Sequence, residues 1–198
     1  MQLPTSFRRV CRTTVLVGFV LAFWWLIPKI AAAAVSYSDL VIKDLPVAYY
    51  RLGEPLYAGA TTRSTSIGTA QALHGFYNNF ASGELAQAGP QTVGFIGDNL
   101  SPIFDATNNY VERTDPGVGS SLDITGGLTL EAWVKVDEGA NLTDWPGVVG
   151  KYLGTGNQRS YTLRVDKDGK ANFAISDNGV WNGAFDFSAG PVLTPGEW

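Results

Sequence analysis

Alternation of apolar and polar side chains over residues 128–136 is the feature that most constrains the fold of this chain. Apolar residues occupy every second position of this segment, and they are Leu128, Leu130, Ala132, Val134 and Val136. Since successive side chains of a β-strand point to opposite faces of a sheet, a period of two predicts a strand with one buried face. No segment after residue 45 has the periodicity of a long amphipathic helix. The pattern therefore favours a fold built from sheets.

Short alternating segments elsewhere in the chain are separated by turns rich in Gly, Asn, Asp and Pro. This rhythm is typical of a β-sandwich or a β-barrel. We expect strands over residues 47–52, 75–77, 101–104, 110–112, 147–152, 160–165, 171–176 and 180–187, and loops over residues 64–68 and 83–94. Residues 166–169 predict a hairpin turn in which Gly169 takes a positive φ. One helical turn, capped by Ser38, is expected over residues 38–45.

The first 34 residues have the composition of an export signal. Three arginines precede an apolar run from Val15 to Pro28, and a row of alanines follows shortly after it. The run is shorter than the about 20 apolar residues of a membrane-spanning helix, which favours a cleaved signal helix over an uncleaved anchor. We expect cleavage just before Ala34 or Val35. The remaining residues, 35–198, then form one exported domain.

Charge and cysteine content narrow the functional classes of that domain. Residues 35–198 contain 10 Lys and Arg against 18 Asp and Glu, a formal charge of −8. An acidic domain without a basic cluster argues against nucleic acid or an anionic membrane as a partner. The single cysteine, Cys11, precedes the predicted cleavage site. The domain therefore has no disulfide and must depend on its hydrophobic core.

The order of several motifs along the chain can be compared with a known family. These motifs are residues 46–54 (PVAYYRLGE), 104–105 (FD), 110–111 (YV), 128–134 (LTLEAWV), 149–152 (VGKY), 160–165 (SYTLRV), 173–179 (FAISDNG) and 196–198 (GEW). Together they resemble the laminin-G-like jelly-roll family of the concanavalin A-like lectin/glucanase superfamily. The resemblance implies an all-β, two-sheet antiparallel jelly-roll sandwich, preceded by the signal helix. Ala106 departs from the family's usual glycine, and the motif at 196–198 implies a domain that is incomplete at its C-terminal end.

The resemblance also implies Ca²⁺ in loops at the rim of the sandwich. Suitable oxygen ligands next to predicted turns are offered by Asp105, Asn108, Asn109, Asp177 and Asn178. The same side chains are suited to closing Asx turns. The lack of a dense Asp-x-Asp-x-Asp-Gly loop favours that structural explanation, and Ca²⁺ is the one cofactor that we consider.

Trp145, Tyr152, Trp181 and Asn182 are the candidate ligand-binding residues. Exposed aromatic rings can stack on sugar rings, while amides hydrogen-bond to sugar hydroxyl groups. Trp145 lies in a polar loop, where a tryptophan has little structural reason to be, and Trp181 follows a turn. The alternative is that the tryptophans pack inside the sandwich, which is the commoner outcome for those in strands.

Catalytic residues are not expected from the sequence. Glu131 shares its strand face with Trp133 and Lys135, without the second carboxylate that glycoside hydrolysis needs. A lone histidine in a loop is usually solvated or hydrogen-bonded locally, so we expect neither a catalytic nor a metal-binding role for His74, the single histidine. We therefore predict a secreted or cell-surface recognition module that binds carbohydrate or an extracellular protein, assisted by Ca²⁺. A glycoside hydrolase or lyase of the same fold, and a structural adhesion or spacer module, remain as alternatives.

Overall fold

The computed structural model describes residues 35–55, 63–68, 73–92, 94, 95 and 99–198. The chain divides into two units between Ala34 and Val35, and only the second unit is described. The predicted signal segment lies outside the described residues. Within the described part of the chain, no helix has the length and apolar character needed to cross a membrane.

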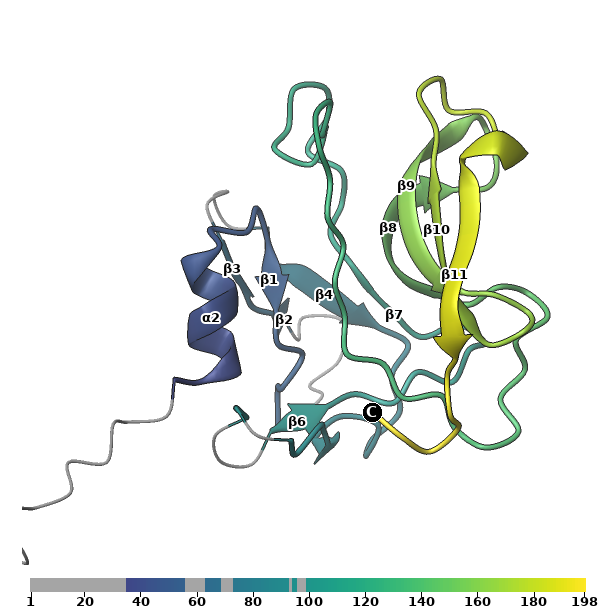
Figure 1. Cartoon of the computed structure of the whole chain (residues 1–198). Helices are drawn as coiled ribbons and strands as arrows, with labels where there is room; N and C mark the ends of the chain where they lie inside the picture. Colours follow the sequence, from purple (N-terminus) through teal and green to yellow (C-terminus); the bar gives the residue numbers. More distant parts are fainter. Residues whose placement is uncertain (1–34, 56–62, 69–72, 93, 96–98) are drawn as a thin grey trace, which may run out of the picture. The chain divides into compact units, whose positions relative to one another are not determined.

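The largest sheet has four antiparallel strands in the order β11-β10-β9-β8 (Figure 1). The strands are β8 (Gly147–Leu153), β9 (Gln158–Val165), β10 (Lys170–Ile175) and β11 (Asp186–Val192). The predicted hairpin turn joins β9 to β10: Gly169 has a φ of +78°, and its N–H donates to the carbonyl of Asp166 at 3.0 Å. The predictions of these two strands and of their turn are confirmed.

Strand register separates the side chains of this sheet into a polar face and an apolar face. Arg164 lies opposite Asn172, and Asn172 lies opposite Ser188. The neighbouring row, on the other face, places Phe173 between Leu163 and Phe187. Because side chains alternate between faces along each strand, this register gathers polar groups from three strands into one row.

The remaining strands are short and form three smaller antiparallel sheets. β1 (Tyr49–Tyr50) pairs with β3 (Ser66–Ile67), β4 (Gly75–Asn78) lies between β2 (Arg63–Ser64) and β7 (Tyr110–Glu112), and β5 (Gln87–Ala88) pairs with β6 (Leu100–Ser101). The described helices are α2 (Tyr37–Lys43) and the 3-10 turn η1 (Gly183–Phe185). Antiparallel strands thus dominate, as the predicted all-β sandwich requires.

A compact aromatic core lies beside β4. Tyr77 is 0 % exposed, and it packs with the buried side chains of Phe80 and Leu85. The rings of Tyr77 and Phe80 meet edge to face, with centroids 5.1 Å apart. Partly buried Leu52 and Val111 complete the cluster. Since β1 precedes Leu52 and β7 contains Val111, this core joins segments that are distant in the sequence.

The segment over residues 115–123 is tied to β8 and β9 by polar contacts. Lys151 donates a hydrogen bond to Asp123 and forms an ion pair with Asp115 at 3.1 Å. The hydroxyl of Tyr161 donates to the carbonyl of Leu122 at 3.1 Å. The hydrogen bond from Lys151 lowers the pKa of Asp123 below its ordinary value. These contacts position the chain that leads into residues 128–136.

Residues 128–136 do not form the predicted strand. Their apolar face is retained in part, because Leu128, Leu130, Val134 and Val136 are half-buried, whereas Ala132 is exposed. Residues 128–135, however, pair with no other described strand. The physical reason is that alternation determines which way side chains point, but a ladder also needs a partner backbone.

Three smaller predictions are also wrong. The strand expected over residues 180–187 begins only at Asp186, because Asn182 caps η1 by accepting from the N–H of Ala184 at 2.9 Å. The short helix is capped by Ser36 rather than Ser38. Its capping box with Asp39 satisfies backbone donors that Ser38 does not reach. The loops expected over 64–68 and 83–94 contain the two-residue strands β3 and β5.

Candidate functional site

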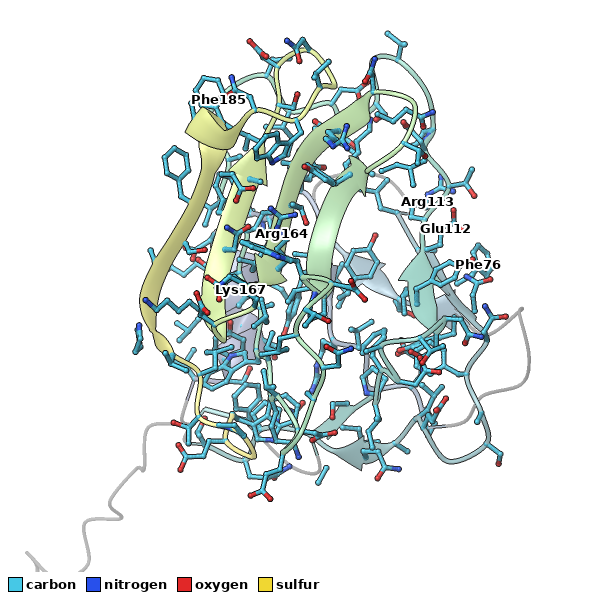
Figure 2. All side chains as sticks on the ribbon, turned by 90° about the vertical axis from the view of Figure 1, so that its right-hand side faces the viewer. Phe76, Glu112, Arg113, Arg164, Lys167 and Phe185 are labelled. Carbon is cyan, nitrogen blue, oxygen red and sulfur yellow. The ribbon has the colours of Figure 1, made fainter. Side chains whose placement is uncertain are left out.

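Arg164, labelled in Figure 2, is the centre of a hydrogen-bonded network on the polar face of the four-stranded sheet. The Nε–H of Arg164 donates to Asn172 Oδ1 at 2.7 Å, and its guanidinium donates to Asp186 Oδ2 at 2.6 Å. Asn172, 1 % exposed, donates from its amide to Asp186 Oδ1 at 2.7 Å and to the hydroxyl of Ser188 at 3.1 Å. The side chains of Arg164 and Asp186 are only 16 % and 13 % exposed. Burial of this charged pair is therefore offset by several hydrogen bonds.

Two of the predicted aromatic residues flank Arg164. Its guanidinium carbon lies 4.7 Å from the centre of the Trp145 ring and 5.9 Å from that of Tyr152. A guanidinium over an aromatic face is attracted by the ring quadrupole. Both rings are half-buried. Trp145 and Tyr152 therefore hold the arginine in place, which is a different role from the exposed stacking surface that the sequence suggested.

The backbone of Trp145 is in the left-handed region. Its φ is +55°, and its N–H donates to the carbonyl of Leu142 at 3.1 Å. That conformation costs a residue with a Cβ about 1–2 kcal/mol. Strained residues of this kind persist where the surrounding structure holds them, and they cluster at functional sites. The strain at Trp145 therefore supports the hypothesis that its ring position beside Arg164 matters to function.

Trp181 and Asn182 lie at the exposed rim of the same network. Trp181 is 58 % exposed, and its indole Nε1–H donates to Asp186 Oδ2 at 3.2 Å. Asn182 is also exposed, with its Oδ1 engaged by the N–H of Ala184. The preceding turn is held by Gly179, which has a φ of +83° and where an added Cβ would lie 1.9 Å from the carbonyl oxygen of Asn157. The loop that carries Trp181 is therefore fixed at both ends.

The network determines the protonation of Asp186. Burial acts to raise the pKa of Asp186, but hydrogen bonds from Asn172, Trp181 and Arg164 outweigh it and hold the pKa below its ordinary value. The carboxylate is therefore charged at neutral pH and remains an acceptor for all three donors.

The lowered pKa predicts how this network responds to acid. A folded-state pKa below the unfolded one adds stability above about pH 4, the ordinary range of aspartate, and the contribution is lost as pH falls through the lower folded value. Urea unfolding at stepped pH should show the wild-type chain losing stability below that range. The difference in stability between the wild type and Asp186→Asn should shrink over the same interval. A difference that is constant down to pH 2 would contradict this account.

The predicted calcium ligands form two groups that close turns. Asp105 Oδ1 accepts from the N–H groups of Thr107 and Asn109 at 2.8 and 3.3 Å, and from that of Asn108 at 3.1 Å. In turn, Asn109 Oδ1 accepts a hydrogen bond from the N–H of Asp105 at 2.8 Å. These are Asx-turn contacts.

The second group of predicted calcium ligands lies after β10. Asn178 Oδ1 accepts from the N–H of Val180 at 2.9 Å, and Asp177 is exposed beside it. No hydrogen bond or ion pair among the described residues joins this group to Asp105, Asn108 or Asn109. Among the described residues, no three His, Cys, Asp or Glu side chains are placed to hold a metal. Calcium binding stays a prediction.

The residues weighed for catalysis do not lie in this network. Glu131 is exposed and makes no hydrogen bond or ion pair with another residue in the described ranges. His74 is half-buried beside the core residue Leu73, whose carbonyl accepts from the hydroxyl of Tyr50. Neither position supplies the pair of carboxylates that the glycoside hydrolase alternative requires.

Sequence reasoning missed Arg164, Asn172 and Asp186, the polar centre of the site. One signal was available, because a hairpin turn at residues 166–169 brings β9 and β10 into register and so places Arg164 near Asn172. Asp186 gave no such signal. Its contact with Arg164 spans 22 residues and depends on where β11 begins.

Comparison with known proteins bears on the second half of the chain. Residues 105–198 match the family model described as the concanavalin A-like lectin/glucanases superfamily. The match covers β7 to β11 and all residues of the Arg164 network. It confirms the predicted resemblance and supports at most a lectin-like module for a glycan or a protein. No curated protein and no solved structure matches the chain.

Proposed function

We propose that this chain, whose residues 105–198 match the family model of the concanavalin A-like lectin/glucanases superfamily, binds carbohydrate at the rim of its Arg164 network. The observation that carries the proposal is the state of Trp181. The residue is 58 % exposed, while its indole N–H donates to the carboxylate of Asp186, whose side chain is 13 % exposed. An exposed aromatic ring held in a fixed orientation offers an apolar face to a sugar ring and loses little conformational freedom on binding.

Polar groups beside the ring are suited to sugar hydroxyl groups. Asn182 is exposed, and because its Oδ1 is bonded to Ala184, its amide Nδ2 is directed by that contact and is a donor. Phe185, 40 % exposed, adds a second apolar surface on η1. An apolar platform with a few fixed polar groups is the usual composition of a small-ligand site. Trp145 and Tyr152 support the site because their rings contact the guanidinium of Arg164.

Replacing Trp181 with alanine tests the proposal. The purified full chain would be applied to an array of immobilised oligosaccharides, with Ca²⁺ and with EDTA, and the best ligand measured by calorimetry. We expect Trp181→Ala to weaken that binding at least about tenfold, because an aromatic ring that a ligand covers on binding contributes more than about 1.4 kcal/mol. Loss of binding in EDTA would in addition support the predicted Ca²⁺.

Phe187→Ala is the matched control for this experiment. Phe187 is 54 % exposed in the same sheet, but it lies in the row of Leu163 and Phe173 on the apolar face. Its loss should leave binding within about twofold of the wild type. Equal losses for both variants, or an array without any ligand in both conditions, would refute the carbohydrate proposal.

A further inference from the structure

The loop that carries Trp181 contains both Asn-Gly pairs of the sequence. They are Asn178-Gly179 and Asn182-Gly183, on either side of the tryptophan. Because glycine has no Cβ, the backbone nitrogen that follows such an asparagine can approach the side-chain amide closely. That nitrogen can displace ammonia from the amide carbon, a reaction that makes asparagine a thermolabile residue. The local geometry of each pair decides how readily this happens.

The side chain of Asn178 is folded over the peptide bond that follows it. Its Oδ1 accepts from the N–H of Val180 at 2.9 Å, and the hydroxyl of Ser176 donates to the carbonyl of Val180 at 2.7 Å. The hydrogen-bonded ring of this Asx turn includes the nitrogen of Gly179. The turn therefore keeps the attacking nitrogen beside the amide carbon, which lowers the entropic cost of the attack.

The groups that react at this position are not engaged elsewhere. In the part of the chain that the structure describes, no hydrogen bond involves the N–H of Gly179, or the Nδ2 or the main-chain carbonyl of Asn178. Asn178 is exposed, so water reaches its amide. The N–H of Val180 already points at Oδ1, the oxygen on which negative charge develops when the amide carbon is attacked. A donor held at that oxygen stabilises the transition state.

Packing requires the glycine of this pair. Gly179 has a φ of +83°, and an added Cβ would lie 1.9 Å from the carbonyl oxygen of Asn157. Its own carbonyl accepts from the N–H of Arg159 at 3.3 Å. A larger residue, which would hinder the attack, cannot take this place without moving the connection between β8 and β9. The fold itself therefore keeps a reactive pair in this loop.

Asn182-Gly183 is the same pair in a more constrained place. Asn182 Oδ1 accepts from the N–H of Ala184 at 2.9 Å, and its main-chain carbonyl accepts from the N–H of Phe185 at 3.0 Å. Attack by the nitrogen of Gly183 requires rotation of the peptide that carries this carbonyl, and the rotation would open η1. We therefore expect Asn182 to react only during local opening of the turn.

We propose that Asn178 is a site of spontaneous deamidation, with water as the co-reactant. The nitrogen of Gly179 forms a bond to Cγ of Asn178, the bond between Cγ and Nδ2 breaks, and the amide proton of Gly179 leaves with Nδ2 as ammonia. Water then opens the cyclic imide at one of its two carbonyl groups. Opening at Cγ gives aspartate, and opening at the main-chain carbonyl gives isoaspartate. No oxidation or reduction takes place in either step.

Both products alter the loop that carries Trp181. Each adds a carboxylate next to Asp177, which is exposed. Isoaspartate also lengthens the main chain by one methylene group three residues before the tryptophan. The reaction occurs in the chain alone and does not depend on the proposed carbohydrate binding.

Mass spectrometry of the aged full chain tests the proposal. The chain is incubated in mildly alkaline buffer with EDTA, folded or in urea, and is then digested with trypsin. Residues 171–198 contain no Lys or Arg, so one peptide reports on Asn172, Asn178 and Asn182 together. In the folded chain, Asn178 should react at least about tenfold faster than Asn182 and within about threefold of its own rate in urea. In urea the two Asn-Gly pairs should react at similar rates.

Controls within the same peptide identify the reaction. Asn172, 1 % exposed and followed by phenylalanine, should keep its amide in the folded chain. Asn178→Gln should abolish the reaction at this position, and Asn178→Asp marks where the aspartate product elutes, so that isoaspartate appears as a second peak of equal mass. A folded-chain rate at Asn178 less than about tenfold above that of Asn182, or more than about threefold below its own rate in urea, would overturn the proposal.

Discussion

Replacing Asp186 with alanine should lower the free energy of unfolding by about 3 kcal/mol. The substitution leaves Arg164 charged in a position where it is 16 % exposed, and removal of one partner from a largely buried ion pair costs about 3–5 kcal/mol. The lower end of that range applies because both side chains keep some contact with water. It also removes the acceptor of Asn172 and Trp181. Urea denaturation of the full chain measures the change.

Two further variants show whether the cost comes from the uncompensated charge. Arg164→Met combined with Asp186→Leu removes both charges and should recover most of the lost stability. Lys167→Ala breaks the pair between Lys167 and Asp168, both 62 % exposed, and should cost no more than about 1 kcal/mol. If Asp186→Ala is as mild as Lys167→Ala, the Arg164 network contributes little to stability.

Replacing Tyr77 with alanine should cost about 3–5 kcal/mol, the range for deleting a buried aromatic ring and leaving a cavity. Tyr77 is 0 % exposed and its ring meets that of Phe80 edge to face. Its hydroxyl donates to Glu54 Oε2 at 2.5 Å, which connects the core to the segment after β1. The midpoint and slope of urea unfolding give the change in stability.

Tyr77→Phe separates packing from the hydrogen bond. It keeps the ring and removes the hydroxyl that donates to Glu54, so the expected cost is about 1 kcal/mol. If phenylalanine is as destabilising as alanine, the hydroxyl rather than the ring supports the core. The comparison matters because the cluster around Tyr77 holds together short strands, none of which is stable alone.

The all-β class and several strands could be predicted because their signals are local. The hairpin between β9 and β10 needs only turn chemistry at residues 166–169, and Gly169 has the positive φ that this chemistry requires. Strand β7 was predicted with the bounds that the structure shows, and β8 differs by one residue. Strand β11 was misplaced because the cap formed by Asn182 competes with the extended conformation before Asp186.

Two residues of the predicted ligand-binding set, Trp145 and Tyr152, are half-buried beside Arg164, and a role in ligand binding stays a prediction for all four. Trp145, Tyr152 and Trp181 contact one network, and Asn182 follows Trp181 in the chain, so the residue types were informative. The positions of Arg164 and Asp186 decide which of these rings are exposed to water. Those positions cannot be inferred from the spacing of residues in the sequence. The ligand and calcium predictions remain to be tested by the array and EDTA comparison.

By itself, the sequence determined the alternation of faces, the turns and the resemblance of residues 105–198 to the concanavalin A-like family model, because each depends on side chains that are neighbours along the chain. The tertiary structure alone decided that Arg164 meets Asp186, that Trp181 stays exposed and that residues 128–135 pair with no other strand among the described residues. These outcomes depend on which backbones come together in space, and hydrophobic periodicity carries no information about the identity of the partner.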